Sequence, residues 1–155
     1  MTDYRTIAQV HKMIDAVTAG VATPHTLELD LPSFPVRVET NSAALHAELQ
    51  NYFREFQGEN LADATVITAL QDPEPPDFGE GRTMTIGEFK QSVKGPKEAF
   101  FDCDDGRVVS KLRTGMWFLF SASRHVAVGP CEANPNQVIN FINNRLIQSC
   151  LHQGM

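Results

Sequence analysis

The amino-acid sequence predicts an α+β fold, in which a mostly antiparallel sheet has about three amphipathic helices packed on it. Two observations predict the sheet: short segments alternate apolar with polar residues or run unbroken through apolar ones, and Gly, Pro and Asp separate these segments. A third observation predicts the helices, because apolar residues recur every three or four positions in three longer segments. We expect the sheet to consist of an N-terminal hairpin plus a C-terminal four-strand meander.

The first helix and the hairpin come at the start of the chain. The spacing of apolar residues predicts a helix over 4–19, with Gly20 in the left-handed position just after its end. Residues 26–31 and 36–40 alternate strictly, and two prolines lie between them, so an irregular hairpin is the simplest interpretation. His11 lies beside the apolar stripe of the helix, and we interpret it as a surface or packing histidine rather than a ligand.

The middle of the chain predicts a second helix, a strand and a loop. Asn41 or Ser42 begins the helix and Gly58 ends it. One apolar stripe predicts its core residues: Leu45, Leu49, Tyr52, Phe53 and Phe56. Residues 64–70 are short and β-branched, which predicts a buried strand. The acidic, proline-rich segment 71–81 predicts a surface loop.

The segment that follows is less regular. Residues 82–86 could form a short edge strand, and 87–96 show no clear pattern before a Gly-Pro turn at 95–96. Each side of this segment alone would make a marginally small domain. We therefore interpret the chain as one domain, 1–155, with a loop or linker at 71–96.

The C-terminal part predicts the meander and the last helix. The four strands are expected at 99–103, 107–112, 116–120 and 125–128. Asp105 and Gly106 predict a type I′ turn between the first two strands. The third strand is an unbroken apolar run, which places it centrally in the sheet. Asn134 as N-cap and Pro135 as first residue begin the helix. Its apolar face is expected to comprise Val138, Ile139, Ile142, Leu146 and Cys150.

Composition and charge make some classes of partner unexpected and favour one cellular compartment. The formal net charge is −6 and no basic cluster occurs, so neither nucleic acid nor an anionic membrane is an expected partner. No apolar run approaches the ~18 residues that a membrane span needs. The cysteines number three and no secretory signal precedes them, which favours free thiols in the cytoplasm.

No catalytic or metal motif is complete in the sequence. The phosphate-binding loop G-x-x-x-x-G-K-[ST], the dinucleotide motif G-x-G-x-x-G and the nucleophile elbow G-x-S-x-G are all missing. An acidic run at 102–106 resembles a calcium loop, but Arg113 stands where the twelfth ligand must be a bidentate acid. Cys150 and His152 are too isolated to predict a zinc site. We therefore assign no catalytic residue, no cofactor site and no metal site.

Two weaker patterns leave alternatives open. Cys103 or Cys131 could act as a nucleophile if the fold brings His125 close, although a structural histidine is the simpler interpretation. A polar set interrupts the last helix, where Asn is a poor helix former: Asn140, Asn143, Asn144 and Arg145. This set could face a partner or a neighbouring domain or bind a small ligand, and a solvated helix face is the alternative.

Several motifs also carry a family resemblance. They are Asp-Gly-Arg-Val-Val at 105–109, Thr-Gly-Met at 114–116, Ala-Val-Gly-Pro-Cys at 127–131 and Asn-Gln-Val-Ile-Asn-Phe-Ile-Asn-Asn-Arg at 136–145. The helix over 7–17 and the Val-Arg-Val run at 36–38 follow the same order. With these motifs the chain resembles the region before the P-loop in proteins related to HPr kinase/phosphorylase, closest to the bacterial HPr-kinase-related kinases.

The resemblance implies a non-catalytic role. In that family a Walker-A loop and a downstream acid perform phosphoryl transfer, and both would lie beyond Met155. The implied function is an N-terminal accessory or regulatory domain that contacts a substrate, a protein partner or its own serine/threonine-type kinase domain. The resemblance implies ATP and Mg²⁺ as cofactors only if a C-terminal P-loop domain exists.

Two other functions remain as alternatives to the accessory domain. One is a free-standing protein-interaction module or homo-oligomer, and the less favoured one is a small cysteine-dependent enzyme. The accessory-domain hypothesis predicts that this chain alone turns over no ATP. The enzyme hypothesis predicts a thiol with a depressed pKa that reacts fast near neutral pH.

Overall fold

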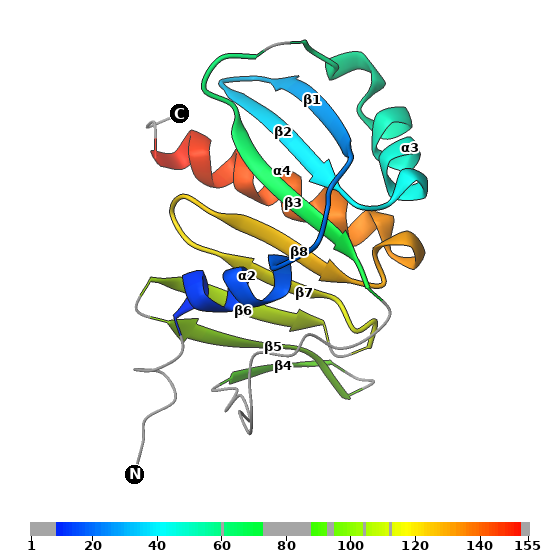
Figure 1. Cartoon of the computed structure of the whole chain (residues 1–155). Coiled ribbons are helices and arrows are strands. Elements are labelled where there is room, and N and C mark those ends of the chain that lie inside the picture. Colours follow the sequence, from blue (N-terminus) through cyan, green and yellow to red (C-terminus); the bar gives the residue numbers. More distant parts are fainter. Residues whose placement is uncertain are drawn as a thin grey trace.

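The strands in the part of the chain that the structure describes form an eight-stranded mixed sheet in the order β1-β2-β3-β8-β7-β6-β5-β4 (Figure 1). The computed structural model describes residues 9–59, 61–72, 88–92, 95–103, 105–111 and 113–152. Its strands are β1 (His25–Leu31), β2 (Phe34–Thr40), β3 (Thr65–Gln71), β4 (Glu88–Ser92), β5 (Gly95–Cys103), β6 (Gly106–Lys111), β7 (Trp117–Phe120) and β8 (His125–Gly129). Its helices are α2 (Val10–Thr18), α3 (Ala43–Tyr52) and α4 (Pro135–His152), with short 3₁₀ turns η1 (Arg54–Phe56) and η2 (Cys131–Ala133).

The α+β class, the N-terminal hairpin and the four-strand meander are confirmed. β1 pairs antiparallel with β2, and β5 to β8 pair antiparallel in sequence order. β3 lies between these two units and runs parallel to both β2 and β8. The helix α3 makes the crossover from β2 to β3, as a parallel connection requires. One continuous sheet therefore joins the N-terminal hairpin to the C-terminal meander through β3.

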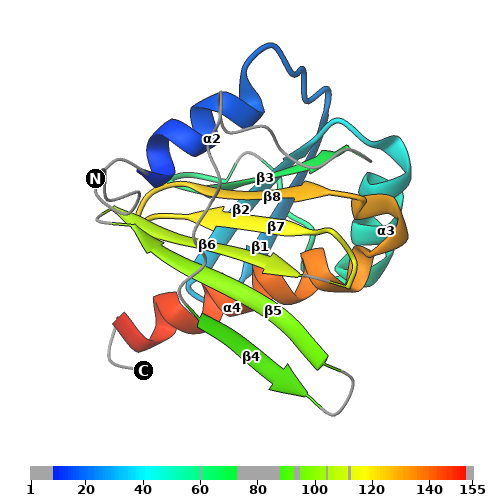
Figure 2. The same cartoon turned by 90° about the horizontal axis from the view of Figure 1, so that it is seen from below.

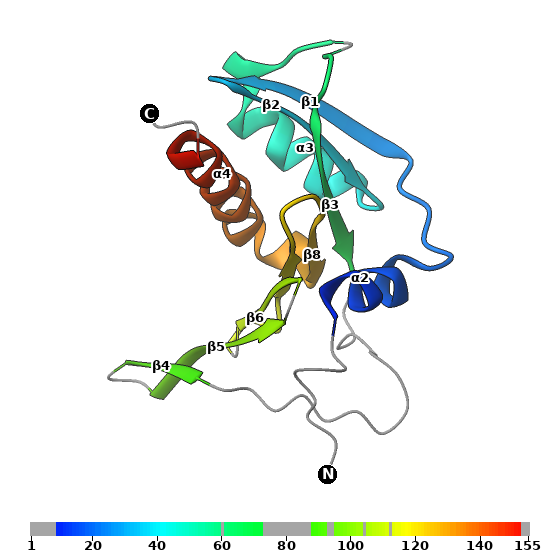
Figure 3. The same ribbon diagram turned by 90° about the vertical axis from the view of Figure 1, so that its left-hand side faces the viewer.

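The two faces of the sheet have separate apolar cores. Helix α2 covers one face, and α3 with α4 cover the other (Figure 2). β7 contributes to both cores, because Leu119 packs under α2 and Phe118 packs on the α4 side. The predicted central position of this strand is confirmed. β5 and β4 extend beyond the helices at one end of the sheet (Figure 3).

The second helix is shorter than predicted. Ser42 caps it as expected, since its Oγ accepts the backbone N–H of Leu45 at 3.0 Å. The helix ends at Tyr52 and continues as η1, whose tighter turn shifts the following side chains around the axis. Leu45, Leu49 and Phe53 are buried, but Tyr52 is 57% and Phe56 is 42% exposed. The assignment of the last two aromatics to the core is therefore wrong.

The hairpin between β5 and β6 forms as predicted, but the type I′ turn expected at Asp105 and Gly106 is wrong. Gly106 is the first residue of β6, pairs with Cys103, and does not have the positive φ that a type I′ turn requires. A Cβ added there would clash with the carbonyl oxygen of Phe120. Glycine is needed at this position because the end of β7 approaches its backbone closely, and not because of turn geometry.

Other boundaries differ from the predictions at several places. β4 occupies part of 87–96, which we interpreted as unpatterned, and pairs with β5 through a register shift between Lys90 and Gln91. The helix predicted over 4–19 is described from Val10, and Gly20 follows it with φ 71° as expected. The predicted strand at 82–86, residues 73–81 of the acidic loop and the side chain of Cys150 lie outside the described residues. None of the described helices is both long and apolar enough to span a membrane.

Candidate functional site

A groove lies between α4 and the strands β6 and β7. Its volume is about 320 Å³. The described lining residues come from three elements. Strand β6 contributes Val109 and Lys111, and β7 contributes Phe118 and Phe120. Helix α4 contributes Gln137, Asn140, Phe141, Asn144 and Arg145.

The sequence periodicity of α4 explains why these side chains meet. Val138, Ile139 and Ile142 are buried in the core, so the positions next to them on the helix border the groove. The groove-lining positions follow the spacing 137, 140, 141, 144 and 145, which is one face of a helix. Period-two alternation places the β6 and β7 side chains opposite this face.

Aromatic rings form the floor of the groove. Phe141 packs against Phe118 with 4.9 Å between ring centroids and against Phe120 with 5.9 Å. The guanidinium carbon of Arg145 lies 4.0 Å from the Phe120 centroid and 5.5 Å from that of Phe141. The arginine is therefore held by cation–π contacts on apolar surface, and burial lowers its pKa.

Arg145 lacks a hydrogen-bond acceptor or an acid within the part of the chain that the structure describes. Its Nε is buried and unpartnered, and none of the ion pairs of the described residues involves it. The described lining contains two cations, three amides and no acid. Lys111 has an interaction of its own, so Arg145 is the cation in the described lining for which the structure gives no ion pair with a described residue.

His125 is the second unsatisfied group on this face of the sheet. It pairs in register with Phe120, is 9% exposed, and its Nδ1 has no partner among the described residues. Burial, together with the smaller effect of the positive charge of Arg145, lowers the pKa of His125 to about 4. The imidazole is therefore neutral near pH 7.

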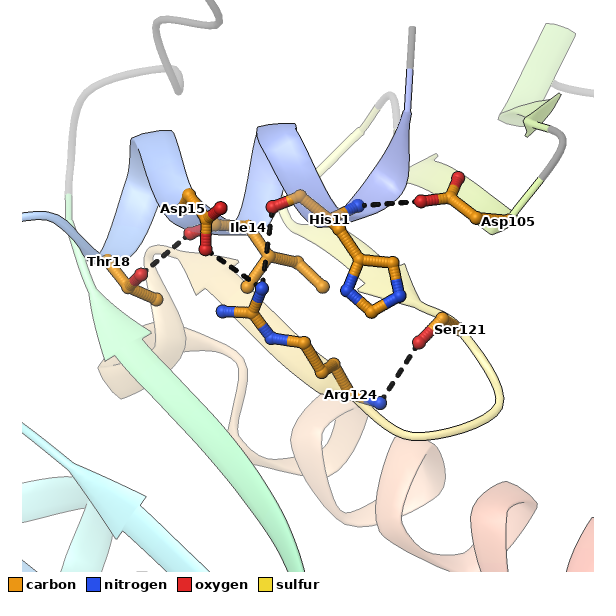
Figure 4. A network of polar contacts seen from close by, with 7 residues as sticks. All are labelled: His11, Ile14, Asp15, Thr18, Asp105, Ser121 and Arg124. Atoms are coloured by element: carbon orange, nitrogen blue, oxygen red, sulfur yellow. Dashed lines mark hydrogen bonds and ion pairs between the residues drawn. The ribbon is translucent and has the colours of Figure 1, made fainter.

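The opposite face has a polar network of a different kind, drawn in Figure 4. The backbone N–H groups of Val10 and His11, at the start of α2, donate to the two carboxylate oxygens of Asp105 at 2.8 and 3.1 Å. Arg124 Nη1 donates to Asp15 Oδ1 at 2.8 Å and to the carbonyl of His11 at 3.5 Å. Ser121 Oγ in turn accepts the backbone N–H of Arg124 at 3.1 Å.

This network, which we call the α2 clamp (Asp105, Arg124, Asp15 and Ser121), fastens α2 to the meander. Burial alone would raise the pKa of Asp105, but the N–H groups of His11 and Val10 outweigh this effect and lower it below the ordinary value. The clamp is a helix cap supplied by a distant strand end, and its described groups are paired. We therefore interpret it as structural.

Three of the four polar residues singled out on the last helix lie at the groove. Asn140, Asn144 and Arg145 line it, whereas Asn143 is half-buried and does not. Sequence reasoning missed Gln137, whose Oε1 accepts the hydroxyl of Thr114 at 3.0 Å, and the aromatic floor. The helical spacing of 137, 140, 141, 144 and 145 is the signal that could have shown this face.

The structure does not bring a cysteine to His125 as a catalytic pair would require. His125 begins β8, and Cys131 follows the far end of this strand at Gly129, about 13 Å from His125 at ~3.3 Å per residue. Its thiol is fully buried and donates to the carbonyl of Leu70 at 3.3 Å, and burial raises its pKa to about 12. Cys103 packs with the core on the α2 side, opposite to Phe120 and Arg145. The described geometry therefore pairs neither Cys103 nor Cys131 with His125.

Metal chemistry has no support among the described residues. No group of three or more His, Cys, Asp or Glu side chains in that part of the chain could hold a metal ion. Asp105, in the acidic run that resembles a calcium loop, uses its carboxylate for the amides of α2. The side chains of Cys150 and His152 lie outside the described residues.

Comparisons with family models, curated proteins and solved structures found no match to this chain. The resemblance to HPr-kinase-related proteins therefore rests on the sequence motifs alone and stays a prediction.

Proposed function

We propose that this chain is a non-catalytic accessory or regulatory domain of an HPr-kinase-like protein in the cytoplasm, and that it contacts a substrate, a partner or its own kinase domain through the α4 groove. The observation that carries this proposal is the unpaired Arg145 at the groove. A buried polar group without a partner costs about 1–3 kcal/mol. Such a group is expected where a bound molecule supplies the missing partner.

The chemistry of the chain supports binding rather than catalysis. The sequence contains no phosphate-binding loop, so ATP and Mg²⁺ would be held by a separate P-loop domain. We therefore assign the residues of this chain no phosphoryl-transfer step. The groove offers a guanidinium, side-chain amides and aromatic rings, which are groups that recognise a ligand.

A second candidate is a homodimer built on α4. Ile147 and Leu151 are 53% and 62% exposed, and they lie four residues apart on one side of the helix. By helical geometry this stripe continues from Asn140 and Asn144. Light scattering tests it, because Ile147→Ser together with Leu151→Ser would shift a dimer to monomer, while a monomer at every concentration would exclude it.

The intact mass of the native gene product tests the main proposal. We expect a mass well above 17.2 kDa, with peptides beyond Met155 that include a glycine-rich Lys-Ser/Thr loop. We also expect the 155-residue chain alone to hydrolyse no ATP. A native mass equal to this chain, or ATP turnover by the purified chain, would overturn the assignment to a kinase accessory domain.

A further inference from the structure

The terminal amino groups of Arg145 point to the chemistry of the groove's ligand. Of the three side-chain nitrogen atoms of Arg145, Nε is buried and has no partner among the described residues. Neither Nη atom is both buried and unpartnered. No hydrogen bond engages those Nη atoms within the described residues either. They are therefore accessible where Arg145 borders the groove.

The orientation of the guanidinium favours a planar anion. One face of the group is covered by Phe120 at 4.0 Å, so a ligand must approach the edge, where the N–H groups form a fork. A carboxylate matches that fork with two parallel hydrogen bonds. The amides of Asn140 and Asn144 lie one helical turn apart on the same wall and can donate to the same anion.

Phosphate is a poorer match to this wall. Phosphate sites usually combine several cations with the free amides of a helix N-terminus or a glycine-rich loop. The anion-binding groups here lie in the middle of α4, and the first residue of that helix is Pro135, which has no N–H. Lys111 also borders the groove but has an interaction of its own.

The rest of the groove is apolar and small. Phe118, Phe120, Phe141 and Val109 present ring and methyl surface beside the arginine. A volume of about 320 Å³ is at the low end for small-molecule sites and accommodates one or two side chains. A carboxylate joined to an apolar or aromatic group satisfies both halves of this surface.

We propose that the α4 groove binds an acidic segment of a protein partner, in which an Asp or Glu carboxylate reaches Arg145 and a neighbouring aromatic side chain packs on the phenylalanine floor. Charge complementarity argues for this occupant, because Arg145 at the groove has no acid partner among the described residues. The inference rests on the proposed function in that the groove is where a partner docks. It does not depend on whether that partner is a kinase.

Short peptides test this inference on the whole 155-residue chain. The probe is an acetylated and amidated peptide, Gly-Phe-Glu-Gly, and the matched probe is Gly-Phe-Gln-Gly. Titration of the ¹⁵N-labelled protein would report binding through shifts of the amide resonances of α4, β6 and β7. We expect the Glu peptide to bind at least about tenfold more tightly than the Gln peptide, with the difference decreasing as salt rises.

Matched variants connect the binding to the named residues. We expect Arg145→Gln to abolish the preference for Glu, and Asn144→Ala to weaken binding about threefold to tenfold. Asn143→Ala is the control, since this asparagine sits on the same helix but does not line the groove. Unchanged spectra of each free variant outside the groove would show that it is folded.

Several outcomes would overturn the inference. They are equal binding of both peptides, unchanged binding to Arg145→Gln, shifts confined to another surface, or no shifts at about 5 mM peptide. Equal shifts with inorganic phosphate alone would assign the groove to a different anion. Phenylacetate binding as tightly as the peptide would indicate a small-molecule site instead. None of these results alters the native mass, so the failure of this inference and that of the kinase assignment are distinguishable.

Discussion

The two faces of the sheet differ in whether particular polar groups on them have hydrogen-bond partners. On the α2 face, the carboxylate of Asp105 accepts two backbone N–H groups and Arg124 is paired with Asp15. On the α4 face, Nδ1 of His125 and Nε of Arg145 are buried without partners among the described residues. Burial of the paired groups supports the fold on the α2 face, whereas burial of these two nitrogen atoms opposes it on the α4 face.

This difference supports the proposal that the α4 face is the one that binds a partner. A fully paired network contributes to stability, whereas an unpaired buried group lowers it. The paired network holds α2 in place, and the unpaired groups lie beside an open groove. Changes to the two faces should then separate stability from binding, and three predictions test that separation.

The largest expected effect is a pH-dependent loss of stability that originates on the α4 face. The pKa of His125 is about 4 in the folded protein and about 6.5 for the ordinary group, so between these values only the unfolded state binds the proton. The stability that depends on neutral His125 is fully present above pH 6.5 and is lost as pH falls toward 4. The loss approaches about 3 kcal/mol, at ~1.4 kcal/mol per pH unit.

Urea unfolding at several pH values between 7 and 4 measures this effect. We expect His125→Leu to flatten the dependence in that window, because it removes the titrating group. His46→Gln is the control, since His46 lies on α3 and its ring contacts the carbonyl of Thr26. The same slope for wild type and His125→Leu would show that His125 does not titrate with a depressed pKa.

A change at Asp105 should give a smaller effect on the α2 face. Asp105→Ala removes the acceptor of two α2 amides and should lower the free energy of unfolding by about 1 kcal/mol. Asp105→Asn retains one acceptor oxygen and should lower it less. The folded-state pKa of Asp105 is below 3.8, so its contribution persists above that value and is lost only as pH falls through the folded-state pKa.

Hydrogen exchange identifies where the Asp105 effect acts. The amides of α2 should exchange faster in Asp105→Ala, while those of α4 should not. Asp15→Ala is the control, because this carboxylate is 70% exposed and its ion pair with Arg124 is worth under ~1 kcal/mol. Equal acceleration on both helices would mean that Asp105 supports the whole fold and not the α2 face.

Much of the fold follows from local signals in the sequence. Alternation and turn residues predict β1, β2 and the meander, because antiparallel neighbours are joined by short connections. The parallel position of β3 has no such signal, since its partners, Val36 for Thr65 and His125 for Ile67, are remote in sequence. β4 was missed because 87–96 do not alternate and Gly-Pro at 95–96 resembles a turn.

The candidate site was predictable only in part, and for a similar reason. Asn140, Asn144 and Arg145 were noticed because asparagines are unusual inside a helix. Their groove depends on Phe118 and Phe120 of β7, which the sequence assigned simply to the core. The hydrogen bonds that join Asp105 to α2 were not predicted either. The two backbone N–H groups that donate to its carboxylate belong to residues 94 and 95 positions away in sequence.

The smallest expected effect on stability is at the residue most important for the proposed binding. Arg145→Met keeps an unbranched apolar side chain on Phe120 but removes the buried, unpartnered Nε. The loss of the cation–π contact, worth about 0.5–2 kcal/mol, opposes the relief of an unsatisfied group, worth about 1–3 kcal/mol. We expect the free energy of unfolding to rise or stay within about 1 kcal/mol of wild type, while binding of the Glu peptide is lost.

Asp105→Ala should show the reverse pattern, with lower stability and unchanged binding. If Arg145→Met instead unfolded the protein as easily as Asp105→Ala, the arginine would belong to the structural core and the contrast between the two faces would be wrong.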